Sequence, residues 1–548
     1  MTFLAFLLRA SWRTVVLAVA AALVSGAGSA GLVALSNAAL ARYGRAPTAF
    51  LAAFVALALV VLVARTASRV ILVHLTQRSI FDLQVGIARR ILAAPYRRLE
   101  EAGSARLLAA LTDDVQAIGE ALPAVPIFAT NVATVAGVLI YLGWLAWPVL
   151  LAVLGVVAVG ALGFRFVAEA AMRAFERARE ERDGLFAHFR ALTEGLKELK
   201  LGAARRAAFM ADVLEPAAEA YRRRVTRGRT LYTSASGATQ ALYFTVLGLL
   251  VFALPVATDL PQETATGFVL GFFFILSPLD EIMDWSPLIS RADVAVRKLD
   301  ALGLSLAEAA EPDPVPTTRP RAVRIDLVGV THRYAREGEE RTFTLGPVDL
   351  AVRSGELLFL VGGNGSGKTT LAKLLTGLYA PETGEVRLDG EPVTEETRPA
   401  YRELFAAVFS DGFLFDRLLG LASPDLDARA RDYLRRLELD HKVTIEGGVL
   451  STTALSQGQR KRLALLAAYL EDRPAYLFDE WASDQDPVFK AVFYRQILPD
   501  LKRRGKAVVV ISHDDRYYDA ADRVVKLESG RIVAETRPSV AGRSRLDG

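Results

Sequence analysis

Long stretches without charged residues dominate the first half of the chain. No Asp, Glu, Lys or Arg occurs between residues 13 and 42, 45 and 65, 120 and 165, 229 and 259, or 263 and 280. A helix needs roughly 20 apolar residues to cross a bilayer. The third of these stretches is long enough for two helices, with "GWLAWP" as the break between them. The pattern therefore predicts six membrane-spanning helices.

Basic residues are distributed unevenly between the connections of these spans. Residues 65–106 contain eight Arg and residues 165–229 contain fifteen Lys or Arg, whereas each connection on the other side contains two or none. By the positive-inside rule, both termini and the two long loops are expected on the cytoplasmic side. Both loops keep apolar residues at helical spacing, which predicts helices that continue past the bilayer. The first apolar stretch is too long for the core of a cleaved signal, so we expect it to remain as a helix.

The hydrophobic pattern changes after residue 310. The segment "EPDPVPTTRPR", residues 311–321, contains four prolines and indicates a linker. Beyond it, short β-rich runs such as "LLFLVGG", "AYLFDE" and "AVVVISHDD" alternate with helical segments. This alternation predicts an α/β domain with a mainly parallel sheet. We therefore expect a helical transmembrane domain with long cytoplasmic extensions at 1–310, a linker at 311–321 and an α/β domain at 322–548.

Composition supports a membrane protein and argues against nucleic-acid binding. The 548 residues are 52% hydrophobic, which is high for a soluble protein. The net charge is only +4, and the basic excess lies in residues 1–310, with 30 basic and 24 acidic side chains, where it sets topology. The absence of cysteine excludes disulfides, thiolate metal sites and cysteine nucleophiles.

A phosphate-binding loop follows the first strand-like run of the α/β domain. In "GGNGSGKTT", the residues Gly362, Gly367, Lys368 and Thr369 fit the pattern G-x-x-x-x-G-K-[ST]. Glycines let backbone N–H groups surround the phosphates, Lys368 reaches the β- and γ-oxygens, and Thr369 ligates Mg²⁺. The pattern predicts a nucleotide site, to which the same loop contributes Asn364, Gly365, Ser366 and Thr370.

An acidic pair ends the strand-like run in "AYLFDEWASDQDP", residues 475–487. By itself, such a pair is more often the start of a solvated turn. In a domain that carries a P-loop, an acid that closes a neighbouring parallel strand holds Mg²⁺, and an acid beside it orients or deprotonates the attacking water. We therefore expect Asp479 to be a Mg²⁺ ligand and Glu480 to be the catalytic base, with ATP and Mg²⁺ as cofactors.

The segment "ALSQGQRKRLAL", residues 454–465, lies between these two motifs, and with it the chain resembles an ABC transporter. The family's signature motif is matched by Leu455, Ser456, Gln457, Gly458 and Gln459, with Gln457 at a position that is often glycine. The resemblance implies that Ser456 and Gly458 contact the γ-phosphate of ATP held by a second nucleotide domain. It thus implies a six-span transmembrane domain of ABC exporter type followed by a P-loop nucleotide-binding domain.

The resemblance implies further site residues. His513 in "VVISHDD" corresponds to the family's switch histidine, so Glu480, His513 and Lys368 are the expected catalytic residues. Tyr334 in "VTHRYAREG" matches the aromatic residue that stacks on adenine, with Phe343 as a rival. Asp486 fits the acid of the loop after the catalytic glutamate.

One position departs from the family's pattern. Family members usually place a glutamine that contacts Mg²⁺ and the membrane domain after the strand that here reads "FAAVFSDGFLFD". This chain has Ser410 and Asp411 instead. Either Ser410 keeps a contact to the metal site or it is a turn residue, and the sequence leaves both open.

The order of six spans and one nucleotide domain is that of an exporter half-transporter. The motifs "VFSDGFLFD", "LSQGQRKRLALL", "YLFDEWASDQDP" and "ISHDDRYY" resemble the bacterial branch that exports cyclic peptides, microcins and peptide siderophore precursors, the syringomycin, pyoverdine and microcin exporters. The resemblance implies a multi-pass protein of the bacterial inner membrane that exports a peptide. A lipid or amphiphile flippase, a multidrug exporter, and an ATP-gated channel or regulator are the alternatives.

Two copies of the chain are expected to work together. One chain has one P-loop and one signature motif, and the family's composite site takes one from each subunit, so a homodimer is required for two sites. A peptide substrate and the lipid bilayer are the other expected partners, and a periplasmic accessory protein is a further candidate.

Acidic residues interrupt the last apolar helix in "LSPLDEIMDWSPL". Acids at membrane depth are costly unless they face a partner or a water-filled cavity. Asp280 and Asp284, at i and i+4, share one helix face. Together with Glu281, they either line the cavity and bind substrate, or lie at the inner interface and pair with basic residues such as Arg291.

Overall fold

The structure is a computed structural model that describes residues 3–42, 48–257, 261–307, 311, 320, 322–334, 343–421 and 423–538. It divides into two units: Met1–Gln84 with Thr112–Asp300, and Val85–Leu111 with Ala301–Gly548. This division differs from the predicted one because residues 85–111 pack with the C-terminal unit. Most of the predicted linker, residues 312–319 and 321, lies outside the described residues.

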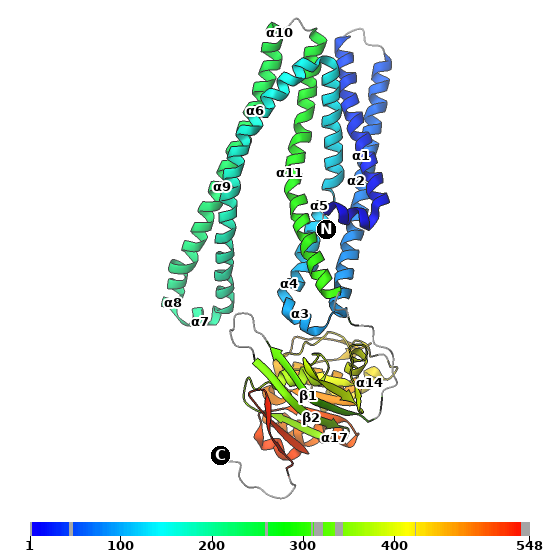
Figure 1. Ribbon diagram of the computed structural model, residues 1–548, viewed down its shortest axis with the longest axis vertical. Helices are drawn as coiled ribbons and strands as arrows, with labels where there is room; N and C mark the ends of the chain where they lie inside the picture. Colours follow the sequence, from blue (N-terminus) through cyan, green and yellow to red (C-terminus); the bar gives the residue numbers. More distant parts are fainter. Residues whose placement is uncertain are drawn as a thin grey trace. The chain divides into compact units, whose positions relative to one another are not determined.

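Long helices build the first unit (Figure 1). The long ones are α1 (Phe3–Ala41), α2 (Thr48–Ala93), α6 (Ala124–Glu194), α9 (Glu215–Gly248) and α11 (Gln262–Ala307), of which α2 and α11 end in the second unit. The short ones are α5 (Val115–Ala121), α7 (Leu196–Leu201), α8 (Ala203–Ala208) and α10 (Leu254–Ala257). By length and composition, four described helical stretches can cross a membrane: Val15–Ala41, Thr48–Ala93, Ser104–Glu194 and Gln262–Leu302. A shorter apolar helix, Gln240–Val256, coincides with the fifth predicted span.

The third and fourth predicted spans are joined in the single element α6. Ala146 has non-helical backbone angles, with φ −161° and ψ 94°, within "GWLAWP". Pro148 lies two residues further on and cannot donate a backbone hydrogen bond to the preceding turn, which accounts for a kink. The predicted break is therefore a kink within one helical element.

Small residues allow the helices of this unit to approach closely. A side chain at Gly26 of α1 would lie 2.6 Å from the carbonyl oxygen of Thr130 on α6. Gly160 of α6 is covered in the same way by Leu242 of α9, and α6 and α9 lie side by side in Figure 1. Membrane helices pack through such small residues because lipid supplies no hydrophobic drive for association.

Two sheets form the core of the second unit. The six-stranded sheet has the order β12-β11-β3-β10-β9-β6, in which only β12 is antiparallel to its neighbour. Its strands are β3 (Leu357–Val361), β6 (Phe405–Val408), β9 (Ala475–Asp479), β10 (Ala507–Ile511), β11 (Arg523–Glu528) and β12 (Arg531–Thr536). Every residue of β3, β9 and β10 is buried, as expected for parallel strands covered on both faces.

An antiparallel sheet and short helices complete this unit. The sheet has the order β2-β1-β4-β5, and a separate hairpin joins two short strands. Its strands are β1 (Arg324–Tyr334), β2 (Phe343–Arg353), β4 (Thr383–Leu388) and β5 (Glu391–Pro392), and those of the hairpin are β7 (Ile445–Glu446) and β8 (Val449–Leu450). The helices are α3 (Tyr96–Ala102), α4 (Ser104–Ala109), α12 (Lys368–Leu375), α13 (Arg398–Arg402), α14 (Leu426–Arg436), α15 (Gln457–Glu471), α16 (Pro487–Val492) and α17 (Leu498–Arg503).

The register of the parallel strands determines which residues meet at their carboxyl ends. Ile511 of β10 is level with Leu360 of β3 on one side and with Asp479 of β9 on the other. Val408 of β6 is level with Phe478 of β9. The loops after β3, β10, β9 and β6 therefore emerge next to one another at one edge of the sheet, where parallel α/β sheets bind ligands.

Candidate functional site

The P-loop connects β3 to α12 and depends on glycine at two close contacts. Gly362 has φ 150°, and a side chain there would lie 2.2 Å from the carbonyl oxygen of Leu527. Gly367 has φ 101° and is covered by Leu345 and by the ring of Phe343. Larger residues would therefore displace the loop from the sheet.

The remaining loop residues differ in exposure. Asn364 and Gly365 are exposed, and Ser366 is buried with no hydrogen-bond partner for its hydroxyl oxygen in the described structure. Thr370 lies in the first turn of α12. An exposed loop that leads into a helix N-terminus has the geometry that binds phosphate.

Lys368 begins α12 and is 5% exposed. Its ammonium donates to the carbonyl oxygens of Gly362 at 3.0 Å and Gly363 at 2.9 Å. Burial lowers the pKa of Lys368, while the negative charges of Glu480 and Asp479 oppose that effect. The structure thus places the predicted cation against the loop that is expected to hold phosphate.

Asp479 ends β9 and is completely buried. Its Oδ2 accepts hydrogen bonds from Thr369 Oγ1 at 3.3 Å and from Ser410 Oγ at 3.4 Å. Its Oδ1 has no hydrogen-bond partner in the described structure. Burial raises the pKa of Asp479, the charge of Glu480 adds to this effect, and the hydrogen bonds from Thr369 and Ser410 oppose it.

These three side chains fit the predicted Mg²⁺ site. A buried carboxylate oxygen without a partner is costly unless a cation or a donor satisfies it. Mg²⁺ takes oxygen ligands and commonly uses one or two carboxylates together with phosphate oxygens. Within the described residues there is no cluster of three or more His, Asp or Glu that could hold a metal ion, so phosphate oxygens would have to complete this site.

Glu480 and His513 meet at the same edge. The Nε2 of His513 lies 3.0 Å from the Oε1 of Glu480. His513 comes two residues after Ile511, and the N–H of Glu480 donates to the carbonyl oxygen of Ile511 at 3.1 Å. Glu480 has φ 49°, a left-handed conformation that is uncommon for residues other than glycine. The strand register therefore brings together two residues that are 33 positions apart.

The signature residues form the N-terminus of α15. Ser456 caps this helix: its hydroxyl accepts from the N–H of Gln459 at 3.4 Å, and the side chain of Gln459 accepts from the N–H of Ser456 at 3.2 Å. Ser456 and Gln457 are exposed. In the part of the chain that the structure describes, no hydrogen bond joins Ser456, Gln457, Gly458 or Gln459 to the P-loop. One chain therefore presents these two motifs separately.

The two rival aromatic residues lie opposite each other on neighbouring strands. Tyr334 of β1 pairs with Phe343 of β2. The side chain of Tyr334 lies outside the described residues, whereas the ring of Phe343 contacts the P-loop at Gly367. The ring of Phe343 therefore lies against the P-loop, and the adenine contact of Tyr334 stays a prediction.

Asp486 makes its described contacts within the protein. Its Oδ1 accepts from the N–H of Phe489 at 2.9 Å and so caps α16, while its Oδ2 lies 2.6 Å from Arg462. The hydrogen bond from Phe489, followed by the charge of Arg462, lowers the pKa of Asp486. These contacts assign it a structural role, and its predicted contact with nucleotide remains a prediction.

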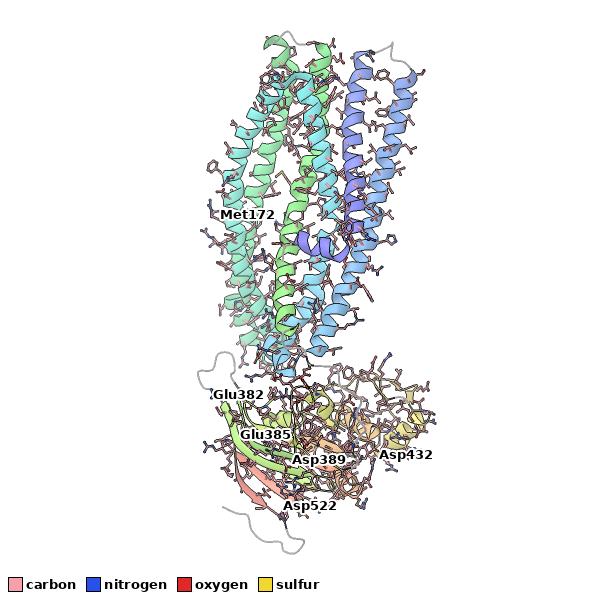
Figure 2. All side chains as sticks on the ribbon, turned by 45° about the vertical axis from the view of Figure 1, so that its right-hand side comes forward. Met172, Glu382, Glu385, Asp389, Asp432 and Asp522 are labelled. Carbon is pink, nitrogen blue, oxygen red and sulfur yellow. The ribbon has the colours of Figure 1, made fainter. Side chains whose placement is uncertain are left out.

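The sequence did not indicate the contacts that the short helix α3 makes with the rest of the second unit. Glu100 of α3 accepts hydrogen bonds from Lys373 Nζ, at 2.9 Å, and from the hydroxyl of Tyr379. Arg97 of α3 donates to Glu382 at 3.3 Å, and Glu382 is labelled in Figure 2. Lys373 lies on α12, five residues after the P-loop lysine, and its partner Glu100 belongs to no sequence motif.

The acids of α11 contact different helices of the first unit. Tyr243 of α9 donates to Asp280 at 3.4 Å, whereas Asn131 of α6 donates to Glu281 at 2.8 Å. Asp284 is exposed. Among the described residues, no ion pair joins these acids to Arg291. The structure therefore does not bring the three acids together.

Comparisons with known proteins match both parts of the chain. A family model described as "ABC transporter" matches residues 345–483, and one described as "ABC transporter transmembrane region" matches residues 12–260. The chain is 36% identical over 503 residues to "ATP-binding protein SyrD" of Pseudomonas syringae pv. syringae. The aligned region covers 89% of this chain and 88% of that protein.

Lipid-transport proteins are also similar to the chain. It is 27% identical over 489 residues to "ATP-dependent lipid A-core flippase" of Alkalilimnicola ehrlichii, and the aligned region covers 83% of this chain and 79% of that protein. It is 30% identical over 332 residues to the protein of the same description from Burkholderia pseudomallei, and the aligned region covers 57% of this chain and 54% of that protein.

Proposed function

Because the chain belongs to the ABC transporter family, as an exporter with a transmembrane domain and an ATP-binding domain, we propose that it exports a peptide from bacteria. The predicted fold class and the ATPase activity coupled to transport are confirmed by these matches, as is the multi-pass membrane character. The proposal adds a homodimer in the inner membrane, with the nucleotide-binding domain and both termini in the cytoplasm. The proposed cargo is a cyclic peptide, a lasso or microcin-like peptide, or a peptide siderophore precursor.

The contact between Glu480 and His513 at the edge of the buried sheet carries the proposed hydrolytic mechanism. The P-loop N–H groups and Lys368 would bind the phosphates, and the end of β9 would place Glu480 near the γ-phosphate. Glu480 would accept a proton from the attacking water, and His513 would orient that carboxylate and contact the γ-phosphate. Thr369, Asp479 and Ser410 would hold Mg²⁺, which neutralises phosphate charge when bound.

A homodimer follows from the separation of the two ATP-binding motifs. Ser456 is exposed and is not hydrogen-bonded to the P-loop of its own chain in the described structure. In the proposed dimer, Ser456 and Gly458 of one chain contact ATP on the P-loop of the other. Binding of two ATP molecules would close the nucleotide-binding domains and turn the transport cavity outward, and hydrolysis would reset it.

Mixed dimers test the composite sites. A dimer with Lys368→Ala in one chain and Ser456→Arg in the other has one intact site, because both changes fall in the same site. Its ATPase rate should exceed that of a homodimer carrying either change. If all three dimers are equally inactive, the composite sites do not work independently.

Peptide cargo is supported by the longer and closer match to SyrD than to the flippases and by the motif resemblance to syringomycin exporters. Asp280, exposed on α11 and bonded to Tyr243, would attract amine groups of such a peptide. A lipid A-type flippase is the second candidate because a flippase matches 83% of the chain.

Stimulated ATPase activity distinguishes the two cargo classes. Purified protein in liposomes should show increased ATP hydrolysis with cyclic peptides, beginning with any peptide product encoded near its gene, and no increase with lipid A. Glu480→Gln protein serves as the control for contaminating ATPases. Stimulation by lipid A alone, together with lipid translocation, would instead support the flippase.

A further inference from the structure

A buried lysine joins the signature helix to the loop after the catalytic glutamate. Lys461, one turn into α15, is 8% exposed. Its ammonium donates to the carbonyl oxygen of Glu480 at 3.0 Å and to Ser483 Oγ at 3.2 Å, and it lies 2.6 Å from Asp484 Oδ2. All three partners belong to one turn of chain.

Each N–H group of the Lys461 ammonium has an oxygen partner. An ammonium group has three N–H donors, and three oxygens receive them here. Burying a charge is costly unless it is paired and fully hydrogen-bonded, and removing one partner of such a pair leaves an uncompensated charge. The arrangement therefore resists displacement of the loop relative to α15.

Further contacts hold the same two segments together. The indole N–H of Trp481 donates to the carbonyl oxygen of Lys461 at 2.7 Å, and Gln485 Nε2 donates to that of Gly458 at 3.0 Å. Gly458 also packs so closely that a side chain there would lie 2.6 Å from the carbonyl oxygen of Asp484. Hydrogen bonds and close packing therefore link the signature turn to residues 480–485.

These two linked segments contain residues of two different ATP sites. In the homodimer of the proposed function, on which this inference rests, Ser456 contacts ATP bound to the partner chain, whereas Glu480 acts on ATP bound to its own chain. Lys461 touches neither the P-loop nor its lysine in the described structure. Its contacts are with the main chain of the catalytic residue and with the turn that follows.

We propose that Lys461 is a positioning residue that connects the two ATP sites of the dimer. Docking of Ser456 on the partner's ATP moves α15, and the bridge from Lys461 to Glu480 and Asp484 carries this movement to the catalytic carboxylate of the same chain. Hydrolysis at one site then depends on nucleotide at the other.

Substitution of Lys461 tests the role through the split between kcat and KM. Lys461→Met keeps an unbranched side chain of similar length and removes the charge. The kcat for ATP should fall on the order of 10- to 100-fold, because small displacements of a catalytic group have effects of that size. The KM for ATP should change by less than about threefold, since the P-loop is untouched, and the cooperativity with ATP should decrease.

Lys506→Met provides a matched control. Lys506 is also largely buried and lies 2.8 Å from the carboxylate of Asp472, but it precedes β10 at the amino end of the strand. This variant should lose stability to a similar degree and keep the wild-type kcat when assayed below its Tm. Lys461→Arg, which can still donate to Asp484, should recover part of the activity. Unchanged kcat and cooperativity in Lys461→Met would overturn the proposal, as would an equal loss of kcat in Lys506→Met.

Mixed dimers then separate the inference from the proposed function. With Lys461→Met and Glu480→Gln on the same chain, the other chain keeps an intact pair, so turnover should exceed that of the dimer with the changes on opposite chains. Equal turnover would overturn the inference. The proposed function fails separately, if the Glu480→Gln homodimer hydrolyses ATP at the wild-type rate.

Discussion

Two pairs of adjacent acids, one at the end of β9 and one within α11, differ in where their side chains find partners. Asp479 and Glu480 both reach partners at one edge of the sheet, from the P-loop helix and from the loops after β6 and β10. Asp280 and Glu281 are also adjacent, but they contact α9 and α6 respectively. A helix turns about 100° per residue, so it directs adjacent side chains apart, whereas parallel strands that end together collect side chains from several segments.

Loss of the carboxylate of Glu480, the residue after β9, should have the largest effect. Glu480→Gln keeps the size and hydrogen-bonding capacity of the side chain but removes the base, which contributes on the order of 10²- to 10⁴-fold to such reactions. ATP hydrolysis should fall by at least about 100-fold, while binding of a fluorescent ATP analogue is retained and a closed dimer accumulates. Hydrolysis at the wild-type rate would show that Glu480 is not the base.

The raised pKa of Asp479 predicts a pH-dependent Mg²⁺ requirement. Only the ionised carboxylate binds the metal, and burial makes Asp479 take up a proton at a higher pH than an exposed aspartate does. The Mg²⁺ concentration for half-maximal ATPase should therefore rise as the pH falls, by severalfold. Ser410→Ala removes a hydrogen bond that favours the ionised form and should move this rise to higher pH.

Thr331→Ala is the control for that experiment. Its hydroxyl pairs with Thr383 in the antiparallel sheet at 2.6 Å and not with Asp479. The variant should follow the wild-type curve. A Ser410→Ala curve that also coincides with wild type would assign Ser410 to the turn alone.

Neutralising the exposed acids of α11 should have a smaller effect, confined to transport. The double change Asp280→Asn and Asp284→Asn should reduce peptide-stimulated ATPase by severalfold and spare basal turnover, because these acids are expected to meet the cargo and not ATP. Stimulation by a proven peptide substrate at the wild-type level would exclude both carboxylates from its binding site.

The smallest effect is expected from loss of the hydrogen bond between Asn131 of α6 and Glu281 of α11. Hydrogen bonds between membrane helices contribute about 0.6 kcal/mol on average, so Asn131→Leu should lower the Tm slightly without changing peptide stimulation. Glu281→Gln keeps an oxygen that can accept from Asn131 and should be milder still. A specific loss of stimulation in either variant would move Glu281 into the substrate site.

Much of the candidate ATP site could be proposed from the sequence because its signals are local. The spacing of glycines and Lys368 identifies the P-loop, and the apolar runs before Asp479 and His513 identify strands whose ends must meet in a parallel sheet. Hydrophobic length likewise indicated the membrane helices. In each case, the information lies within a few residues or within one periodic stretch.

Only the tertiary structure decided which distant residues are partners. Ser410 reaches Asp479 because β6 lies beside β9, and Lys461 reaches Asp484 because α15 packs against the loop after β9. Glu100 accepts a hydrogen bond from Lys373, which lies 273 positions later in the chain, and no local pattern marks either residue. The sequence by itself determined the elements and the chemistry at their ends, because periodicity and backbone geometry act locally. Strand order and helix packing, which depend on the whole chain, determined the contacts between those ends.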